Sequence, residues 1–534
     1  MFTEGAELPN NVAELQEMIA VLYKKVEELE QREQQYETEN KLLRERISQL
    51  TFKIYGRKFE KLRLESDSKQ GVLFPDVSQE SVIDEDSECD EIKVKSHKRK
   101  RGGRKPIPDT FPRVEVVHDI SEEEKRCGCG CEMVEIGREA SEQVEMTRPR
   151  FWVTRHIRLK YACKNCEGVE SDSGAVKIAP MPDQLIPRSI CSASLLSHIV
   201  VSKFCDSIPL YRQEKQFLRY GIAISRAKMC HWLLKVWDKC KVLDELLLRE
   251  LHSGPLINMD ETSFQVISES GRSASSHSYM WVSRGGLPGR WVCLYRYSPS
   301  RSGAVARQLL KGYRGYVQTD GYRGYNFLDA WPGIIHVGCW SHTRRKFVEV
   351  VKLVGKKNRE GLAVQALRLI SKLYKIEKEA REAELSVEEL TARRQKESKE
   401  IVDQFESFLK KNINKVLPES LLGQAFSYSL SQMPRLRHFL KDGRIPLDNN
   451  WVENAIRPFA LGRKNWLFCY SEEGAHASAL YYSLIETAKA NGLEPYKYMR
   501  YLFENLPAAR TEEDYKKLLP QYVDKDQLDK LFEV

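Results

Sequence analysis

Residues 257–264 of the chain read Ile-Asn-Met-Asp-Glu-Thr-Ser-Phe, and the fold is organised around this stretch. A short apolar run ends in two carboxylates, Asp260 and Glu261, and then continues with residues that favour β-structure. The pattern predicts a buried strand that carries an acid at its centre or end. A buried charge is costly unless something neutralises it, and a bound cation is one common solution. A solvated turn after a strand is the alternative that this stretch leaves open.

The segments that follow alternate between strand and helix. They are strand candidates at 279–282 and 291–295, a helix at 303–310, an extended run at 315–322 and a strand at 334–340. This order predicts a mixed α/β sheet of ribonuclease-H-like type, in which the first and fourth strands are neighbours. Asp320 ends the fourth strand at a glycine turn, so this arrangement would bring it close to Asp260, 60 residues earlier.

A third acid lies much further along the chain. Asp448 or Asn449 can cap a short helix that is expected to end near Pro458, and Glu453 lies in its first turns. Two aspartates on adjacent strands and a glutamate on a following helix can hold two Mg²⁺ (or Mn²⁺) ions. Magnesium prefers oxygen ligands, and paired ions stabilise both the attacking and the leaving oxygen in phosphoryl transfer. The sequence therefore predicts a catalytic, metal-binding triad.

Composition sets the broad class of protein. At 534 residues the chain is long enough for about three or four domains. Its net charge of +9 is modest, and no apolar run is long enough to span a bilayer. We expect an intracellular, soluble protein without a membrane partner. In a reducing compartment its 13 cysteines are expected to be thiols or metal ligands rather than disulfides.

A heptad repeat dominates the first expected domain, residues 1–63. One seam of the repeat consists of residues spaced seven apart: Leu15, Leu22, Leu29, Tyr36, Leu43 and Leu50. A partner seam of β-branched residues, interrupted by Glu33 and Asn40, predicts a parallel two-stranded coiled coil that makes a homodimer or a higher oligomer. A single amphipathic helix that packs on its own domain is the alternative.

Residues 64–112 predict a disordered acidic linker followed by a basic arm. The arm is expected to contact DNA phosphates or enter a minor groove, and a solvated charge run is the alternative. Its candidate DNA-binding residues are Lys98, Arg99, Lys100, Arg101, Arg104 and Lys105.

Residues 113–180 predict a small β-rich module that binds a structural Zn²⁺ ion. The candidate ligands are Cys163 and Cys166 together with two of Cys127, Cys129 and Cys131. The alternation of residues 153–161 predicts a strand with a basic outer face. A redox-active cysteine pair is the alternative reading of the cysteines.

Residues 181–253 predict a helical region, with a glycine turn between a helix at 210–220 and a helix at 226–237 that Ser225 caps. Arg226 and Lys228 near the start of the second helix are compatible with a helix-turn-helix that reads DNA. Helical pairs that do not touch DNA are equally compatible with this pattern.

The remaining chain divides into a catalytic core at 254–355, a helical insertion at 356–440, and a second part of the core with C-terminal helices at 441–534. Residues 362–417 contain neither Gly nor Pro, which favours helices in the insertion. Cys339 with His342 could bind a metal, but two ligands do not make a site, and a packed strand-helix junction is the better explanation of this pair. Further basic residues expected near DNA, with simple solvent exposure as the alternative, are Arg344, Arg345, Lys346, Arg457, Arg463 and Lys464.

The chain resembles the insertion-sequence-66 family of transposases. The resemblance rests on residues 259–262, 319–322, 449–458, 461–468 and 482–488, and it extends to the N-terminal heptads, the basic arm and the cysteine module. It implies a bacterial DDE transposase with Asp260, Asp320 and Glu453 as its acids. Such an enzyme binds element ends and target DNA, and cuts and joins strands in metal-dependent reactions, with element-encoded accessory proteins as possible partners. A ribonuclease-H-like nuclease without strand transfer and a zinc-dependent dimeric DNA-binding regulator are the rival functions.

Overall fold

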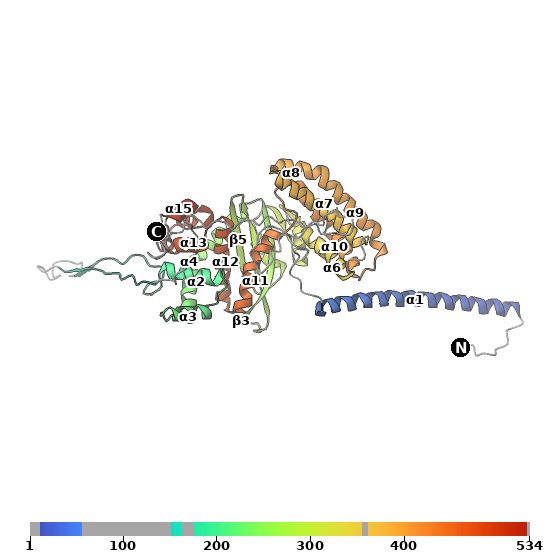
Figure 1. Ribbon diagram of the computed structural model, residues 1–534, viewed down its shortest axis with the longest axis horizontal. Coiled ribbons are helices and arrows are strands. Elements are labelled where there is room, and N and C mark those ends of the chain that lie inside the picture. The colour runs from blue at the N-terminus through green and yellow to red at the C-terminus, as the bar shows by residue number, and fades with distance from the viewer. Residues whose placement is uncertain (1–10, 56–150, 163–175, 355–360, 531–534) are drawn as a thin grey trace, which may run out of the picture. The chain divides into compact units, whose positions relative to one another are not determined.

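The computed structural model describes residues 11–55, 151–162, 176–354 and 361–530 (Figure 1). Contacts divide the chain into two compact units, one of residues Met1–Asp84 with Asp183–Val534 and one of residues Glu85–Pro182. The candidate DNA-binding residues of the basic arm and all five candidate zinc ligands lie outside the described residues. The DNA-binding role of the arm and the zinc site therefore remain predictions.

Helix α1 (Val12–Tyr55) confirms that the heptad segment is helical. The apolar seam residues along it are about half exposed, for example Leu22 at 48%, Leu29 at 55% and Leu43 at 53%. Apolar side chains repeated along one face of a long helix are typical of a surface that packs against another helix. The coiled coil remains a prediction.

In the unit of residues Glu85–Pro182, strand β1 (Lys160–Ala162) pairs antiparallel with β2 (Val176–Ile178). The strand predicted at residues 153–161 is wrong for most of its length, because residues 151–159 form no strand. Polar and apolar residues do alternate here, but a strand also needs a partner strand for its backbone hydrogen bonds. The partner, β2, pairs through only three residues.

A mixed sheet forms the centre of the other unit. Its main strands are β3 (Leu256–Ser268), β4 (His277–Leu287), β5 (Arg290–Ser298), β6 (Gly315–Gln318) and β7 (Ile334–Val337). They lie in the order β5-β4-β3-β6-β7, and a short strand β8 (Cys469–Ser471) pairs with the far end of β3. Strands β3, β4 and β5 are antiparallel, whereas β6 runs parallel to β3, and β7 parallel to β6. The predicted neighbourhood of the first and fourth strands is confirmed.

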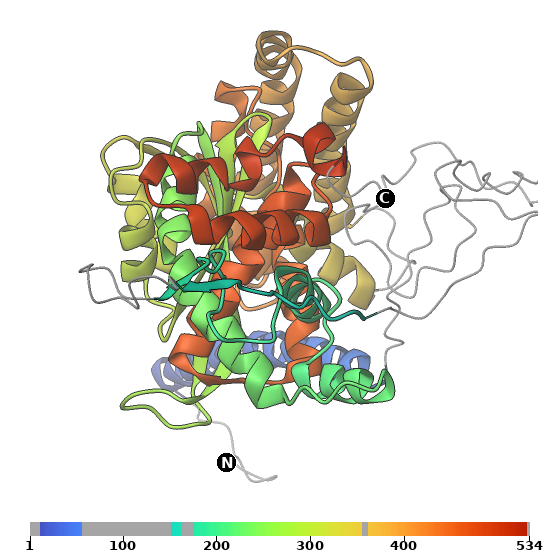
Figure 2. The same ribbon diagram turned by 90° about the vertical axis from the view of Figure 1, so that its left-hand side faces the viewer.

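Helices from before and after these strands in the sequence complete this part of the unit (Figures 1 and 2). The helices α4 (Arg226–His252) and α12 (Glu472–Ala490) contact the strands directly. The helices α2 (Ala193–Phe204), α3 (Leu210–Arg219) and α13 (Pro495–Asn505) pack on other helices of this group. Ser225 caps α4 as predicted, since its hydroxyl accepts from the Lys228 N–H. The outer edge of β5 donates its backbone N–H groups to hydroxyls of α12, namely from Cys293 to Thr487 and from Tyr295 to Ser483. The helix thereby covers an edge that would otherwise present unpaired donors.

The first strands and these helices share one hydrophobic core. The remaining short elements close the unit: α5 (Gly303–Leu309), η1 (Arg323–Ala330), α14 (Glu512–Lys517) and α15 (Lys525–Lys530). Across the residues that the structure describes, no helix combines the length and apolar character needed to cross a bilayer.

The helical insertion is confirmed and has a hydrophobic core of its own. It follows α6 (Trp340–Val354) and contains α7 (Leu362–Glu382), α8 (Val387–Arg393), α9 (Lys399–Asn412), α10 (Leu421–Leu436) and the 3₁₀ turn η4 (Arg437–Lys441). Between α8 and α9, residues Arg394–Ser398 form one π-helical turn. This turn directs the long side chain of Arg394 into the interior, where it is 1% exposed.

Helix α11 (Asn450–Trp466) corrects one expectation, because it does not end near Pro458 but continues through it. Proline removes one intrahelical hydrogen bond and crowds the preceding turn. The residues beyond it nevertheless pack well: Phe459 is fully buried, with its ring 5.2 Å from that of Phe264 on β3 and 5.3 Å from that of Tyr482 on α12. Gly462 lies so close to the Tyr482 hydroxyl that a Cβ atom would stand 2.4 Å from it. Burial of this face offsets the local cost of the proline.

Candidate active site

Strands β3 and β6 bring the first two acids together. Asn258 is paired with Gln318 in the parallel ladder, and each aspartate lies two residues further along its chain. Because side chains alternate between the two faces of a strand, a step of two residues keeps the same face. Asp260 lies inside β3, just beyond its last pair with β6, and Asp320 follows the end of β6 at the equivalent position.

The charges of Asp260, Asp320 and Glu453 converge. Burial raises the pKa of the Asp260 carboxyl to about 7, and the negative charges of Glu261, Asp320 and Glu453 act in the same direction. A single hydrogen bond from the Glu261 N–H to Asp260 Oδ1, 2.8 Å long, acts against them. Charges from β6 and α11, which are distant from β3 in the sequence, thus act on the Asp260 carboxyl.

The neighbouring acid, Glu261, points elsewhere and has its own partners. Its buried carboxylate accepts from Arg301 Nε at 2.6 Å and from the Tyr325 hydroxyl at 2.5 Å. The guanidinium of Arg301 also lies over the ring of Tyr322, 3.9 Å from its centroid. Adjacent residues of a strand face opposite sides, so the carboxylates of Asp260 and Glu261 leave β3 in different directions. Glu261 is a structural acid that links β3 to the segments before and after β6.

Glu453 lies in the first turns of α11, where it faces α6. Its Oε2 atom is 3.4 Å from Arg345 Nη2, and its Oε1 atom is 3.8 Å from His342 Nδ1. At the start of the helix, Asp448 accepts from the Asn450 N–H, whereas the side chain of Asn449 reaches back to β3. Of the two predicted caps, Asp448 therefore binds the helix end and Asn449 anchors the helix to the sheet.

A buried cluster of amide side chains joins the elements that carry the three acids. Asn258 Nδ2 donates to Gln318 Oε1 at 2.7 Å and to Asn449 Oδ1 at 2.9 Å. Asn449 Nδ2 donates in turn to the Met259 carbonyl, and Gln318 Nε2 to the Pro446 carbonyl. Each of the three amides is at most 1% exposed. Buried polar groups with satisfied hydrogen bonds favour one arrangement, so this cluster sets the position of α11 on β3 and β6.

Replacing Asn258 by Leu is expected to lower the free energy of unfolding by about 2–3 kcal/mol. Two buried amide oxygens, on Gln318 and Asn449, would lose their donor, and each unsatisfied group costs about 1–3 kcal/mol. Denaturant unfolding measures the change. The matched control is Asn505→Leu, since Asn505 bonds only locally, to the Tyr501 carbonyl on an exposed surface. Equal stability of the two variants would show that the cluster does not hold these elements together.

The helical insertion also contributes to this region through Tyr428 on α10. A Cβ atom at Gly321, directly after Asp320, would stand 2.5 Å from the Tyr428 ring, so the glycine is required for this close approach. The charge of Asp320 adds to burial in raising the pKa of Tyr428. The sequence did not indicate a role for Tyr428, because a tyrosine in an amphipathic helix usually packs in the hydrophobic core.

The structure separates the candidate DNA-binding residues into several groups. Arg226, Lys228, Arg345 and Lys464 are exposed, whereas Arg344, Lys346 and Arg457 are partly buried. Lys346 Nζ lies 4.6 Å from the centroid of the Tyr428 ring. Arg463 donates to the Thr262 hydroxyl at 2.8 Å and to the Ser263 carbonyl, so it fastens α11 to β3. Because its guanidinium is bound to β3, Arg463 has a structural role.

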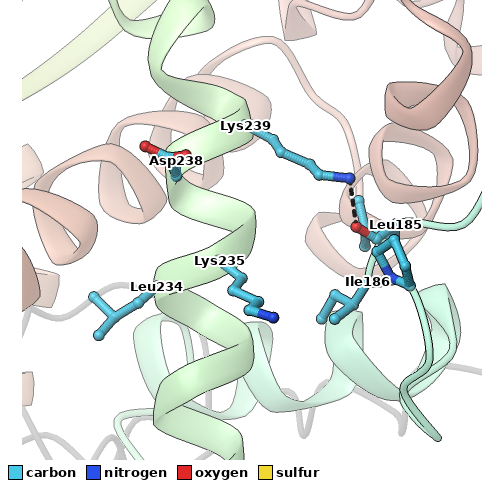
Figure 3. A pocket seen from close by; sticks show the side chains of 7 residues that line it. Leu185, Ile186, Leu234, Lys235, Asp238 and Lys239 are labelled. Carbon is cyan, nitrogen blue, oxygen red and sulfur yellow. Dashed lines mark hydrogen bonds between the residues drawn. The ribbon is translucent and has the colours of Figure 1, made fainter.

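An open groove lies between α4 and the segment that precedes α2 (Figure 3). It is lined by Leu185, Ile186, Pro187, Leu234, Lys235, Asp238 and Lys239. Lys239 Nζ donates across it to the Leu185 carbonyl at 2.8 Å. The groove contains none of the three acids, and we assign it no chemistry.

Comparisons with known protein families identify the class of protein. A model described as the transposase IS66 family matches residues 188–477, and the IS66 C-terminal element matches 483–521. A zinc-finger binding domain of transposase IS66 matches 124–167, and a model described as transposase C of IS166 homeodomain matches 42–116. The chain is therefore a transposase. Since the first of these matches covers more than half of its length, it belongs to the IS66 family.

Similar proteins occur in Sinorhizobium fredii (strain NBRC 101917 / NGR234). The chain is 30% identical to the uncharacterized protein y4jD over 486 residues, which cover 88% of this chain and 92% of that protein. It is 29% identical to the uncharacterized protein y4qI over 550 residues, covering 96% and 97% of the two chains. The zinc-finger match includes the five candidate cysteines and supports a structural zinc ion, and the matches together support DNA as the partner.

Proposed function

We propose that this transposase cuts DNA strands at the ends of an insertion element and joins them to a target by divalent-metal-dependent phosphoryl transfer. Asp260, Asp320 and Glu453 are the proposed catalytic and metal-binding residues. The observation that carries the proposal is the convergence of three acids from β3, from the turn after β6 and from the start of α11. The strand order β5-β4-β3-β6-β7, with β6 parallel to β3, supports a ribonuclease-H-like core for this chemistry.

The residues of the site suit Mg²⁺ or Mn²⁺. All three side chains offer carboxylate oxygens, the donors that these ions prefer, and Asp260 and Asp320 leave adjacent strands. Burial, with the negative charges of Glu261, Asp320 and Glu453, raises the pKa of Asp260, and a bound cation would offset both effects. When bound, such ions activate the attacking water or 3′-hydroxyl and stabilise the leaving oxygen.

The chain's own residues would orient the acids and the DNA. The amide cluster of Asn258, Gln318 and Asn449 holds the three acid-bearing elements in place, and the bonds of Glu261 keep that carboxylate away from the site. Arg345 lies beside Glu453 and is exposed, so it is suited to meet a phosphate close to the scissile bond. Arg226, Lys228 and Lys464 offer further exposed cations for DNA.

The N-terminal half would supply binding and assembly. We propose a dimeric coiled coil at α1, with its half-exposed apolar seam as the support, and a four-cysteine zinc site between residues 127 and 166. As a bacterial DNA-binding enzyme it would act in the cytoplasm, on the nucleoid.

Product analysis separates the proposed function from its rivals. The purified protein, labelled candidate element ends and Mg²⁺ are incubated, and the cleaved and joined strands are sized. A transposase yields both cleaved ends and strand-transfer products, whereas a nuclease yields only cleaved ends. A DNA-binding regulator yields neither, so binding without any metal-dependent cleavage would refute the proposal.

Mg²⁺ is expected to raise the melting temperature of the protein more at about pH 8 than at about pH 5.5. Because the pKa of Asp260 is raised from 3.8 to about 7, this carboxyl stabilises the metal-free fold at low pH. That stabilisation is lost as the pH rises from about 4 to about 7, when the carboxylate becomes charged. Mg²⁺ neutralises the charge above pH 7 but must displace a proton below it.

Differential scanning calorimetry with and without Mg²⁺ measures both shifts. In Asp260→Asn, which carries no ionisable group at this position, the difference between the two pH values should shrink. An equal Mg²⁺ effect at both pH values in the unaltered protein would contradict the assignment of Asp260 as a ligand.

A further inference from the structure

A cysteine, a histidine and a glutamate meet where α6 faces α11. We propose that Cys339, His342 and Glu453 form a separate site for a borderline-soft divalent ion such as Zn²⁺, and that filling it withdraws Glu453 from the other two acids. The second part rests on the proposed catalytic role of Glu453. The first part concerns only metal binding and is independent of that role.

The geometry suits one small ion. One ligand atom from each of the three residues lies within 4.8 Å of both others. His342 Nδ1 and Glu453 Oε1 are 3.8 Å apart, which is too long for a hydrogen bond. A histidine nitrogen and a carboxylate oxygen that share a tetrahedral zinc ion, with bonds of about 2.0–2.2 Å, are separated by roughly 3.3–3.5 Å. The two atoms would therefore move together by a few tenths of an ångström when the ion binds.

The two facing atoms lack other partners. Within the described part of the chain, His342 Nδ1 and Glu453 Oε1 are both buried and neither takes part in a hydrogen bond. Native proteins rarely leave buried polar atoms in this state, and an absent ion is a common explanation. A cation between them would satisfy both.

Cys339 is placed to act as the third ligand. It lies directly before α6, its side chain is buried, and its Sγ atom accepts from the Asn449 N–H at 3.2 Å. Burial raises the pKa of the Cys339 thiol to about 12, and the Asn449 N–H acts in the opposite direction. Cysteine binds metals as the thiolate, so an incoming ion would displace the thiol proton. Thiolate, imidazole and carboxylate together select zinc over magnesium, which takes oxygen ligands.

The site would compete with the acid triad for one carboxylate. Glu453 contributes charge at Asp260, yet its Oε1 atom faces His342 in this arrangement. A zinc ion bound to Oε1 would hold the carboxylate toward α6. Zinc is therefore expected to inhibit Mg²⁺-dependent cleavage through Cys339 rather than by replacing Mg²⁺ at the aspartates.

Cobalt binding tests the site without reference to activity. The full-length protein, with its N-terminal cysteine module already loaded with zinc, is titrated with Co²⁺, and thiolate-to-cobalt charge-transfer absorption is recorded. We expect one additional thiolate-bound cobalt in the unaltered protein and none in Cys339→Ser. Cys191→Ser is the matched control, because Cys191 is a buried cysteine outside the cluster.

His342→Gln provides a second variant should Cys339→Ser fail to fold, and circular dichroism checks both. It is expected to weaken cobalt binding by at least about tenfold. Identical cobalt spectra and stoichiometry in the unaltered protein and a folded Cys339 or His342 variant would overturn the metal site.

Zinc inhibition of Mg²⁺-dependent cleavage tests the second part. The inhibitory zinc concentration is expected to rise by at least about tenfold in Cys339→Ser, measured against that variant's own uninhibited rate. Cobalt binding at Cys339 with equal zinc inhibition of both proteins would refute the withdrawal of Glu453. A protein that binds cobalt at Cys339 but never cleaves DNA would refute the proposed function and leave the metal site supported.

Discussion

Replacing Asp260 by Asn, or Glu453 by Gln, is expected to abolish strand cleavage and strand transfer while binding to element ends persists. Each change keeps the shape of the side chain but removes a charged metal ligand. Metal ions contribute several kcal/mol of transition-state stabilisation, and a loss of about 4 kcal/mol slows a reaction about a thousandfold. Gel-based cleavage assays measure the rate, and electrophoretic mobility shifts measure binding to the same DNA.

Glu261→Gln is the matched control for Asp260→Asn, because it neutralises the adjacent residue, which binds Arg301 and Tyr325. Its activity is expected to stay within about tenfold of the unaltered protein, consistent with a loss of about 1.4 kcal/mol or less. Metal-free Asp260→Asn should unfold at the same temperature or higher at alkaline pH, since burial disfavours the charge that it removes. Full activity of Asp260→Asn or Glu453→Gln would refute the triad.

Replacing Arg394 by Met is expected to lower the free energy of unfolding by about 3–5 kcal/mol, the usual result of leaving one partner of a buried ion pair alone. Arg394 Nε and Nη2 donate to the two carboxylate oxygens of Glu377, each at 2.7 Å. Its Nη1 atom donates to the carbonyls of Phe439 and Asp442. The side chain thus joins α7 to the segment that leads back toward α11.

Denaturant unfolding measures the loss for Arg394→Met, and hydrogen exchange should place the added flexibility in the helical insertion. Arg393→Met is the matched control. Arg393 forms ion pairs with Glu379 and Glu397, but these are partly exposed, and such pairs contribute about 1 kcal/mol or less. Similar destabilisation of the two variants would show that the buried pair stabilises the fold no more than the partly exposed pairs do.

Much of the catalytic domain could be predicted from local patterns. The apolar run at 257–264 predicted β3, and the glycine turn after Asp320 marked the end of β6. The absence of Gly and Pro from residues 362–417 predicted the helical insertion. Such features depend on backbone preference and on the period of burial, which neighbours in sequence determine. The same reasoning failed at residues 153–159 and beyond Pro458, where pairing or packing partners decided the outcome.

The sequence alone was enough to propose the three acids, because the local structure around each one is predictable and the order of the motifs resembles that of a known family. The family resemblance singled out Asp260 rather than Glu261, but no sequence pattern indicated that Glu453 would face His342. The amide cluster links Asn258 to Asn449, 191 residues away, and the candidate zinc ligands join α6 to α11. Contacts of this kind depend on how strands and helices pack, and side-chain spacing along one element carries no information about the element opposite. The tertiary structure alone decided these partners.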